Sequence, residues 1–249
     1  MVNLPIKRLH RFYTTYPLEI NCTVVLPLST AVHLRALRIA VGQTIQLFNG
    51  DGFNYDAMLT AVEKKSATVQ VISKQLAVTE SPLKISLLQC FSTSTKMDWI
   101  LQKAVELGVY AFCPLVSERS NVKLGETKTV CKLNRWRQIC LSACEQTGRA
   151  ELPILHPLTD FQTAVSNIDT EIKLILDPNA SYPTYSIRDL KQPPALAVLV
   201  GPEGGFSKQE LQLANDYGFI SCTLGPRVLR TETAPLAALS SLQALYGDF

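Results

Sequence analysis

The chain has 249 residues, of which 47% are hydrophobic and 18% are charged, and its formal net charge is +3. This length suffices for one large domain or two modest ones, and no run of about 18 apolar residues predicts a membrane span. Residues 1–8 lack the apolar stretch of a secretory signal, so we expect a cytoplasmic protein.

The seven cysteines contain no C-x-x-C pair, and their odd number favours reduced thiols in a cytosolic protein. Cys140 and Cys144 lie four positions apart on a predicted helix. The three histidines, His10, His33 and His156, lie far from them in the sequence. We therefore predict two small core side chains there, and no metal site.

Charge is distributed unevenly along the chain. Residues 1–76 carry eight Lys/Arg and four Asp/Glu, whereas residues 77–249 carry sixteen and seventeen. This distribution indicates a small basic domain joined to a near-neutral one. The first domain would bind an acidic polymer, and the second would carry out the chemistry. An ordinary solvated surface explains the same distribution equally well.

Residues 1–76 are predicted to form a small, mostly β domain. The turn Asn49-Gly50-Asp51-Gly52 contains two hairpin dipeptides in succession. We expect a helix over 29–40, capped by Ser29 or Thr30, and a compact β-barrel. Residues 76–82 are polar, end in Ser-Pro and predict a linker. The predicted strands are 22–26, 44–48, 55–62 and 67–72.

From Leu83 onward, predicted strands alternate with predicted helices. Thr95 with Asp98, and Ser207 with Glu210, have the spacing of capping boxes. The alternation predicts an α/β domain over 77–249, with a parallel sheet flanked by helices. The predicted strands are 85–91, 110–116, 172–176, 195–200 and 220–224; the predicted helices are 96–107, 132–147, 208–217 and 234–246, and Gly108, Gly148 and Gly218 end the first three helices.

Two glycine-bearing turns, at 201–207 and 224–234, each join a predicted strand to a predicted helix. They suggest neighbouring strands whose carboxyl ends open onto one crevice, where α/β sheets bind ligands. Neither turn fits the dinucleotide or P-loop fingerprint. The glycines either let a ligand approach the backbone closely or merely serve tight turns that need a positive φ.

Three charged residues in these turns are candidates for function. Glu203 and Glu232 precede helices, where a carboxylate compensates the helix dipole, although Glu232 could also steer a substrate. Arg230 lies between apolar segments and needs an acceptor, such as a phosphate or a base carbonyl. The scattered histidines form no Ser-His-Asp or Cys-His constellation, which disfavours hydrolytic catalysis.

Cations and aromatic residues alternate near the amino terminus, in residues 7–13. This composition suits phosphate contacts combined with base stacking, and equally a short basic tail packed by its own aromatic side chains. The stretch 119–149 is also basic, with seven Lys/Arg and two Asp/Glu.

Several motifs spread along the chain occur together in one known family. They are RFY at 11–13, the segment 33–42 leading to NGDG at 49–52, KAVELGV at 103–109, ERS at 118–120, EQTGR at 145–149, GPEGGFS at 201–207 and LRTETA at 229–234. On these motifs the chain resembles the RsmE-type methyltransferases, which methylate N3 of a uracil in small-subunit ribosomal RNA. Residues 156–194 match the family poorly.

The resemblance implies a fold, a cofactor and an assembly. It implies an amino-terminal PUA-like β-barrel over 1–76 that binds RNA, and a SPOUT methyltransferase domain over 77–249 that contains a deep trefoil knot. It further implies a homodimer that acts on 16S ribosomal RNA or the small ribosomal subunit and uses S-adenosylmethionine (SAM).

The chemistry of the residues gives the candidates for catalysis and RNA binding, and the resemblance gives the candidates for SAM binding. Arg230 and Glu232 are the catalytic candidates, and the expected RNA contacts are Lys7, Arg8, Arg11, Tyr13, Arg119 and Arg149. The expected SAM contacts are Asp177, Pro178, Leu199, Val200, Gly201, Pro202, Glu203, Gly204, Gly205, Leu224, Gly225, Val228, Leu229, Arg230, Thr231 and Ala234.

We hypothesise that the glycines of the two turns admit SAM closely and that Arg230 stabilises negative charge on a uracil carbonyl oxygen. No residue stands out as the base that removes the N3 proton. Competing interpretations are an RNA-binding or ribosome-assembly factor without catalysis, an enzyme that binds a nucleotide phosphate at 201–205, and a methyltransferase acting on another RNA or another atom.

Overall fold

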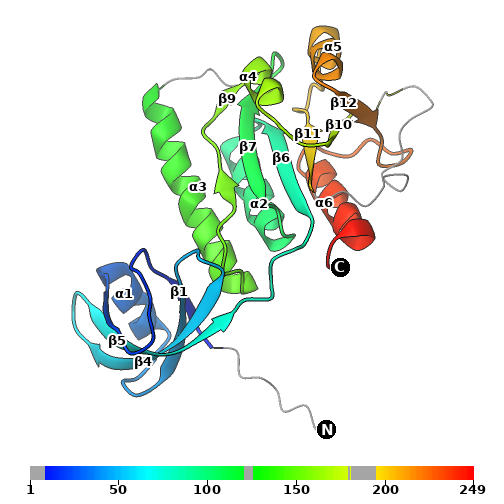
Figure 1. Cartoon of the computed structure of the whole chain (residues 1–249). Helices are drawn as coiled ribbons and strands as arrows, with labels where there is room; N and C mark the ends of the chain where they lie inside the picture. Colours follow the sequence, from blue (N-terminus) through cyan, green and yellow to red (C-terminus); the bar gives the residue numbers. More distant parts are fainter. Residues whose placement is uncertain (1–8, 121–125, 179, 181–194) are drawn as a thin grey trace. The chain divides into compact units, whose positions relative to one another are not determined.

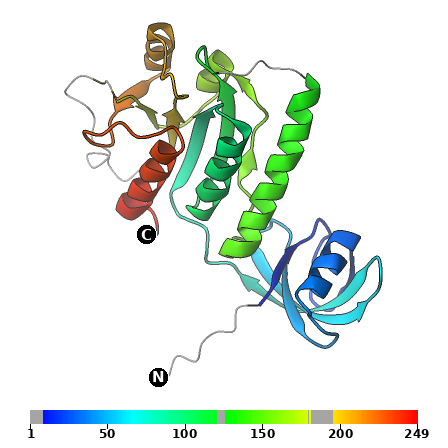
Figure 2. The ribbon, with the colours of Figure 1, turned by 180° about the vertical axis from the view of Figure 1, so that it is seen from behind.

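The computed structural model describes residues 9–120, 126–178, 180 and 195–249, without the side chains of 126–129 (Figures 1 and 2). The described residues divide into two compact units. The first contains 9–80 and 144–152, and the second contains the rest. The segment 144–152 therefore groups with the amino-terminal unit, although residues 144–147 form the end of the predicted helix 132–147. No helix among the described residues is long and apolar enough to cross a membrane.

The first unit is a five-stranded sheet with one helix, α1 (Leu28–Ala36). The strand order is β1-β3-β4-β5-β2, in which β1 and β3 run parallel and the other neighbours antiparallel. The β4–β5 pairing shifts register twice, and such shifts bend a sheet around its core. The strands are β1 (Arg11–Tyr13), β2 (Thr23–Leu26), β3 (Thr44–Phe48), β4 (Phe53–Val62) and β5 (Ala67–Leu76).

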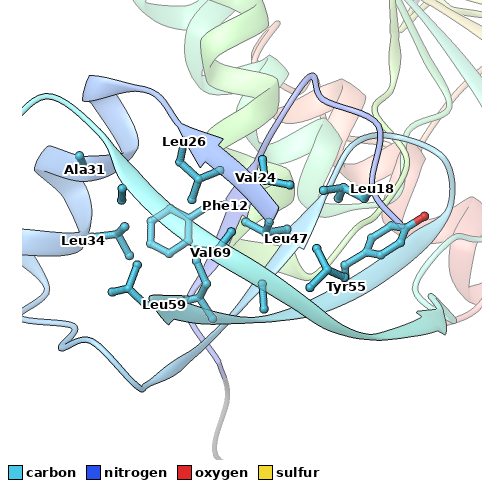
Figure 3. Packing of buried hydrophobic residues seen from close by; sticks show 14 residues of the cluster. Phe12, Leu18, Val24, Leu26, Ala31, Leu34, Leu47, Tyr55, Leu59 and Val69 are labelled. Carbon is cyan, nitrogen blue, oxygen red and sulfur yellow. The ribbon is translucent and has the colours of Figure 1, made fainter. Parts of the chain in front are cut away.

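The core of the first unit lies between the sheet and α1 (Figure 3). Phe12 of β1 packs among apolar side chains such as Leu34 of α1 and Val69 of β5. Alternation along the strands produces this arrangement, since every second side chain of β5, from Ala67 to Val71, is buried.

The predicted start of α1 at Ser29 or Thr30 is wrong. The N-cap is Pro27, whose backbone is extended and which makes no side-chain cap. Proline suits a helix start because its fixed φ fits there and no N–H is left unpaired. The helix also ends before the predicted residue 40, because Arg38 adopts a left-handed φ of 56°.

An ion pair holds the segment 144–152 in the first unit. Arg149 is only 5% exposed, and its Nε and Nη2 donate to Oε2 of Glu80 at 3.0 and 2.8 Å. The other oxygen of Glu80 accepts the Glu151 amide at 3.3 Å. Arg11 adds to the network, because its Nη2 donates to the Arg149 carbonyl at 2.9 Å. A buried guanidinium is stable only with such acceptors around it.

The second unit contains a sheet whose strands are all parallel, as predicted. Its order is β12-β10-β11-β6-β7-β8, and β9 also pairs with β7. The strands are β6 (Lys84–Cys90), β7 (Ala111–Val116), β8 (Ile154–Leu155), β9 (Thr159–Asp160), β10 (Ile172–Leu176), β11 (Ala195–Val200) and β12 (Phe219–Cys222).

Helices cover both faces of this sheet. The helices α2 and α6 contact each other, and α2 lies on the face turned toward the viewer in Figure 2. The helices α4 and α5 contact each other and, with the opposite face, enclose a core that contains Phe161 and Phe219. The helices are α2 (Ser94–Glu106), α3 (Glu126–Thr147), α4 (Phe161–Ser166), α5 (Lys208–Asp216) and α6 (Thr233–Tyr246).

Helix ends follow the sequence signals in most places. The capping box of Ser207 and Glu210 is present in both directions at the start of α5. The predicted cap of α2 at Thr95 is wrong, because Thr93 has the extended backbone of a cap and accepts the Lys96 amide. Positive φ angles at the three predicted helix-ending glycines confirm those helix ends: Gly108, Gly148 and Gly218.

The Arg149–Glu80 pair makes a prediction about stability. Glu80→Gln should lower the free energy of unfolding of the first unit by about 3 kcal/mol, because it leaves a buried guanidinium without its counter-charge. Urea unfolding measures this. The matched control is Glu63→Gln, an exposed carboxylate in the same unit, which should change stability by no more than about 0.5 kcal/mol. Equal effects of the two substitutions would contradict a structural role for the pair.

Candidate active site

A cavity of about 660 Å³ opens where β10, β11 and β12 end, within the second unit. Its volume lies within the range of small-molecule sites, roughly 300–1,000 Å³. Of the residues predicted to contact a cofactor, all but Leu199 line it. Leu199 is fully buried in the core beneath α4 and α5, because alternation along β11 turns it to the face opposite Val200.

The two glycine turns lie on one cavity, but their strands are not neighbours as predicted. β10 lies between β11 and β12. Helix α5 carries the chain across β10, a crossover that the sequence pattern does not reveal. The turn after β10, at Asp177 and Pro178, therefore lies between the two glycine turns and also lines the cavity.

The glycines of the two turns serve different purposes. Gly205 and Gly225 have positive φ, and a Cβ on either would meet no atom within 4 Å, so their backbone is open to a ligand. At Gly201, a Cβ would lie 3.1 Å from the Phe206 ring, and at Gly204 it would lie 3.2 Å from Cβ of Arg119. These two glycines make room for protein side chains.

Cations outnumber carboxylates around the cavity. Two of the four cations, Arg227 and Arg230, are exposed and have no hydrogen-bond or ion-pair acceptor among the described residues. The backbone of Arg230 is fixed, because its carbonyl accepts the amides of Thr233 and Ala234 at 2.9 Å each. The charged lining residues are Lys96, Arg119, Arg227 and Arg230 against Asp177 and Glu203.

Lys96 connects the carboxylates of both glycine turns. Its Nζ lies 2.9 Å from Glu203 and 3.1 Å from Glu232, and the Ser92 hydroxyl donates to the same oxygen of Glu203. These contacts raise the pKa of Lys96, the hydrogen bond to Glu203 most of all. Burial by itself raises the pKa of Glu203, but the hydrogen bonds from Ser92 and Lys96 outweigh it and lower the pKa.

Arg119, in the segment after β7, also lines the cavity. Arg119 Nη1 donates to the Gly204 carbonyl at 2.8 Å. The buried carboxylate of Glu210 accepts the Glu118 amide at 2.7 Å and the Ser207 amide at 2.9 Å. Arg119, which was predicted to contact RNA, thus supports the first glycine turn.

A direct hydrogen bond links the two glycine turns. The Thr231 hydroxyl of the second turn donates to the Gly201 carbonyl of the first at 2.5 Å. Thr231 is buried, so water competes little for this bond. The two turns are therefore connected both by this bond and through Lys96.

Comparison with known proteins identifies the family. A family model described as RNA methyltransferase domain matches residues 79–243, and one described as RNA methyltransferase PUA domain matches 30–72. Ribosomal RNA small subunit methyltransferase E of Buchnera aphidicola subsp. Schizaphis graminum is 35% identical over 97% of this chain and 98% of its own length. The Bacillus subtilis enzyme of the same name is 32% identical over 86% and 88%.

The chain belongs to the ribosomal RNA small subunit methyltransferase E family. Two solved structures with bound SAM are similar to it along 97% of this chain and 100% of their own. The first is ribosomal RNA small subunit methyltransferase E of Neisseria gonorrhoeae, with 41% identity and a TM-score of 0.91. The second is a methyltransferase of Legionella pneumophila, with 39% identity and a TM-score of 0.92.

Membership in this family confirms the predicted fold class, with a PUA-like first unit and an α/β methyltransferase second unit. The trefoil knot and the homodimer stay predictions.

The predicted RNA contacts of the first unit stay predictions, and the structure shows which of these residues also have contacts within the unit. Lys7 and Arg8 lie outside the described residues. Arg149 is buried against Glu80, and Arg11 donates to Gln46, to Asn54 and to the Arg149 carbonyl, so both guanidinium groups are used within the unit.

Tyr13 has internal contacts as well. Its amide donates to Glu145 at 3.0 Å, and its ring packs edge-on against Phe48 at 5.6 Å. Phe12 thus lies in the core, and half-buried Arg11 and Tyr13 have contacts within the unit. Their predicted contacts with RNA stay a prediction.

Sequence reasoning missed several lining residues, notably Lys96, Phe206 and Arg227. Lys96 lies shortly after the end of β6, and this position after a parallel strand could have indicated a residue at the cavity. Phe206 and Arg227 lie inside the two glycine turns, and their residue types do not show whether a side chain lines the cavity or packs in the core.

The close contact at Gly201 predicts a steric effect. Gly201→Ala should lower the free energy of unfolding by about 1–3 kcal/mol, since the added methyl group meets the Phe206 ring, which itself packs 5.9 Å from Phe161. Urea unfolding of Gly201→Ala, Phe206→Leu and the double variant tests this. The double variant should lose less stability than the two single losses together. Strict additivity would rule out the steric conflict.

Proposed function

We propose that this chain transfers the methyl group of SAM to N3 of a uridine in 16S ribosomal RNA, acting as a homodimer in the cytoplasm. The observation that carries the proposal is the cavity at the ends of β10, β11 and β12, where Gly205 and Gly225 leave backbone open to a ligand. The SAM-bound relatives and the shared family name support the same cofactor and the same class of RNA.

The composition of the cavity fits SAM. Leu176, Val200, Leu224 and Leu229 offer apolar surface for an adenine ring. Asp177 and Glu203 offer carboxylates for hydroxyl groups and for positive charge, and backbone groups at the glycine turns are accessible for further hydrogen bonds. When bound, SAM supplies a methyl group carried on a positively charged sulfur.

The roles of the protein are positioning and electrostatics. Uracil N3 must lose its proton before the nitrogen can accept a carbon, and negative charge then spreads onto the ring carbonyl oxygens. Arg230 is exposed at the cavity, its backbone is fixed by α6, and it has no acceptor among the described residues. We assign to it the stabilisation of that charge.

Glu232 receives a different role from the one first considered. Its carboxylate lies 3.1 Å from the Lys96 ammonium, and its pKa is lowered: burial acts to raise it, but its own backbone amide and Lys96 outweigh that effect. A carboxylate of lowered pKa is a weak base. We therefore treat Glu232 as part of the frame of the site.

The RNA backbone needs exposed cations, and the first unit offers a group of them beside the end of α1. We call Arg35, Arg38, Lys64 and Lys65 the α1 patch; all four are exposed. The Arg35 guanidinium donates to the carbonyls of Glu63 and Lys64 at 3.2 Å each, which holds the β4–β5 turn close to the helix. A cluster of exposed cations suits phosphate groups.

The function is tested by methylation of small ribosomal subunits from cells that lack the corresponding gene. The purified chain with SAM should create one 3-methyluridine in 16S RNA, detected by mass mapping of nucleosides. Binding of SAM and RNA without any methylation would instead support an RNA-binding assembly factor. Methylation of another RNA or atom would identify a different target for the same fold.

The assignment of Arg230 predicts a catalytic defect. Arg230→Ala should lower kcat on small subunits by about 10²–10³, the typical loss when one donor to a developing negative charge is removed. Steady-state methylation with SAM and small subunits both saturating measures it. Arg227→Ala is the matched control: an exposed arginine on the same turn, it should lower kcat less than tenfold. Normal turnover by Arg230→Ala would exclude the proposed role.

The α1 patch predicts a change in salt dependence. Lys64→Gln with Lys65→Gln should weaken RNA binding and make the slope of log K against log [salt] shallower by about 1.4–1.8, since each lost phosphate contact contributes about 0.7–0.9. Filter binding at several salt concentrations measures the slope. Lys74→Gln is the control, because Lys74 lies over the Phe53 ring at 4.0 Å. An unaltered slope in the double variant would remove the patch from the RNA footprint.

A further inference from the structure

Lys96 stands in the first turn of α2, a helix that belongs to neither glycine turn. Its ammonium nevertheless contacts a carboxylate from each: Glu203 after β11 at 2.9 Å, and Glu232 immediately before α6 at 3.1 Å. One charge on a separate element thus contacts a carboxylate from each glycine turn, of which Glu203 lines the cavity.

The position of Lys96 is itself well determined. The Thr93 side chain caps α2 by accepting the Lys96 amide, and Ser92, one residue earlier, donates to the oxygen of Glu203 that Lys96 also contacts. Met97, the next residue, is fully buried in the core. The start of α2 is therefore fixed both to the core and to the first glycine turn.

Without Lys96, the two carboxylates would face each other unbalanced. The side chain of Glu232 is only 19% exposed, and that of Glu203 is 46% exposed, so water screens their repulsion incompletely. The direct link between the turns, from Thr231 to the Gly201 carbonyl, would then have to oppose that repulsion.

We propose that Lys96 is a positioning residue that sets the spacing of the two glycine turns by neutralising Glu203 and Glu232, and that SAM binding depends on this spacing. The inference rests on the proposed function, because it concerns the same cavity. It adds a residue from outside both motifs, and it assigns the two glutamates a joint role.

A role for Lys96 as the base that takes the uracil proton is inconsistent with its surroundings. The two carboxylates raise the pKa of Lys96, so it stays protonated at neutral pH and has no lone pair to accept a proton. Its effect on the reaction therefore passes through the geometry of the two turns.

The experiment compares four variants of the full chain: Lys96→Gln, Lys96→Arg, the pair Lys96→Gln with Glu232→Gln, and Lys103→Gln. Lys103 is the matched control, because it lies on the same helix and pairs with Glu106 at 2.7 Å with nearly the same side-chain exposure, 34% against 32% for Lys96. Calorimetry gives the Kd for SAM, and methylation of small subunits gives kcat and KM.

We expect Lys96→Gln to weaken SAM binding about three- to ten-fold, the sum of two partly exposed ion pairs, with kcat at saturating SAM changed less than twofold. Lys96→Arg should stay close to the unmodified chain, since arginine keeps the charge. The double variant should recover much of the lost affinity, because a single carboxylate no longer needs a balancing charge. Lys103→Gln should behave as the unmodified chain.

Unchanged SAM affinity in Lys96→Gln would overturn the inference. A double variant no better than Lys96→Gln would also overturn it, because Lys96 would then act independently of Glu232. If Lys96→Gln fails to fold, Lys96→Met, which also removes the charge, serves as the test, and unchanged SAM affinity in that variant would overturn the inference. Failure of the proposed function is distinct, since the unmodified chain would then neither bind SAM nor methylate RNA.

Discussion

The parallel alignment of β12, β10 and β11 is the constraint on which the site depends. Leu176 at the end of β10 pairs in register with Val200 at the end of β11 and with Cys222 at the end of β12. The chain therefore leaves three adjacent strands at one level of the sheet. Their three turns must meet, and the space that they enclose is the cavity at which parallel sheets characteristically bind ligands.

Once the turns meet, their shape is set by short-range contacts of several kinds. Gly205 and Gly225 adopt backbone conformations that other residues rarely reach, and they leave the cavity open. Gly201 and Gly204 allow Phe206 and Arg119 to pack closely. The capping box at the start of α5 fixes the end of the first turn. The resulting frame places an uncommitted cation, Arg230, beside apolar and glycine surfaces suited to a nucleoside-containing cofactor.

Local features of the fold could be predicted from the sequence, because their causes are local. The bounds of β3, β10 and β11 match the predicted strands, since short apolar runs between polar residues specify them. The same holds for the capping box of α5. The predicted burial of Cys140 and Cys144 is also confirmed, because amphipathic spacing along a helix identifies its inner face.

Features that depend on distant parts of the chain could not be predicted. The strand order, which places β10 between the two glycine turns, is set by how α5 crosses the sheet. Arg11 and Arg149 suggest nucleic-acid contacts as residue types, and the sequence does not show that they also contact Asn54 and Glu80, which lie far away in the chain. The role proposed for Lys96 depends on two turns that lie far from it in the sequence and contact it only in the folded chain. In each case the decisive neighbour is remote in sequence, and residue type alone does not identify it.

A crystal structure of the full chain with SAM tests the central claim most directly. The account predicts that SAM occupies the cavity between the turns after β10, β11 and β12, in contact with backbone at Gly205 and Gly225. SAM bound elsewhere on the chain, or turns that separate to leave no shared cavity, would contradict it.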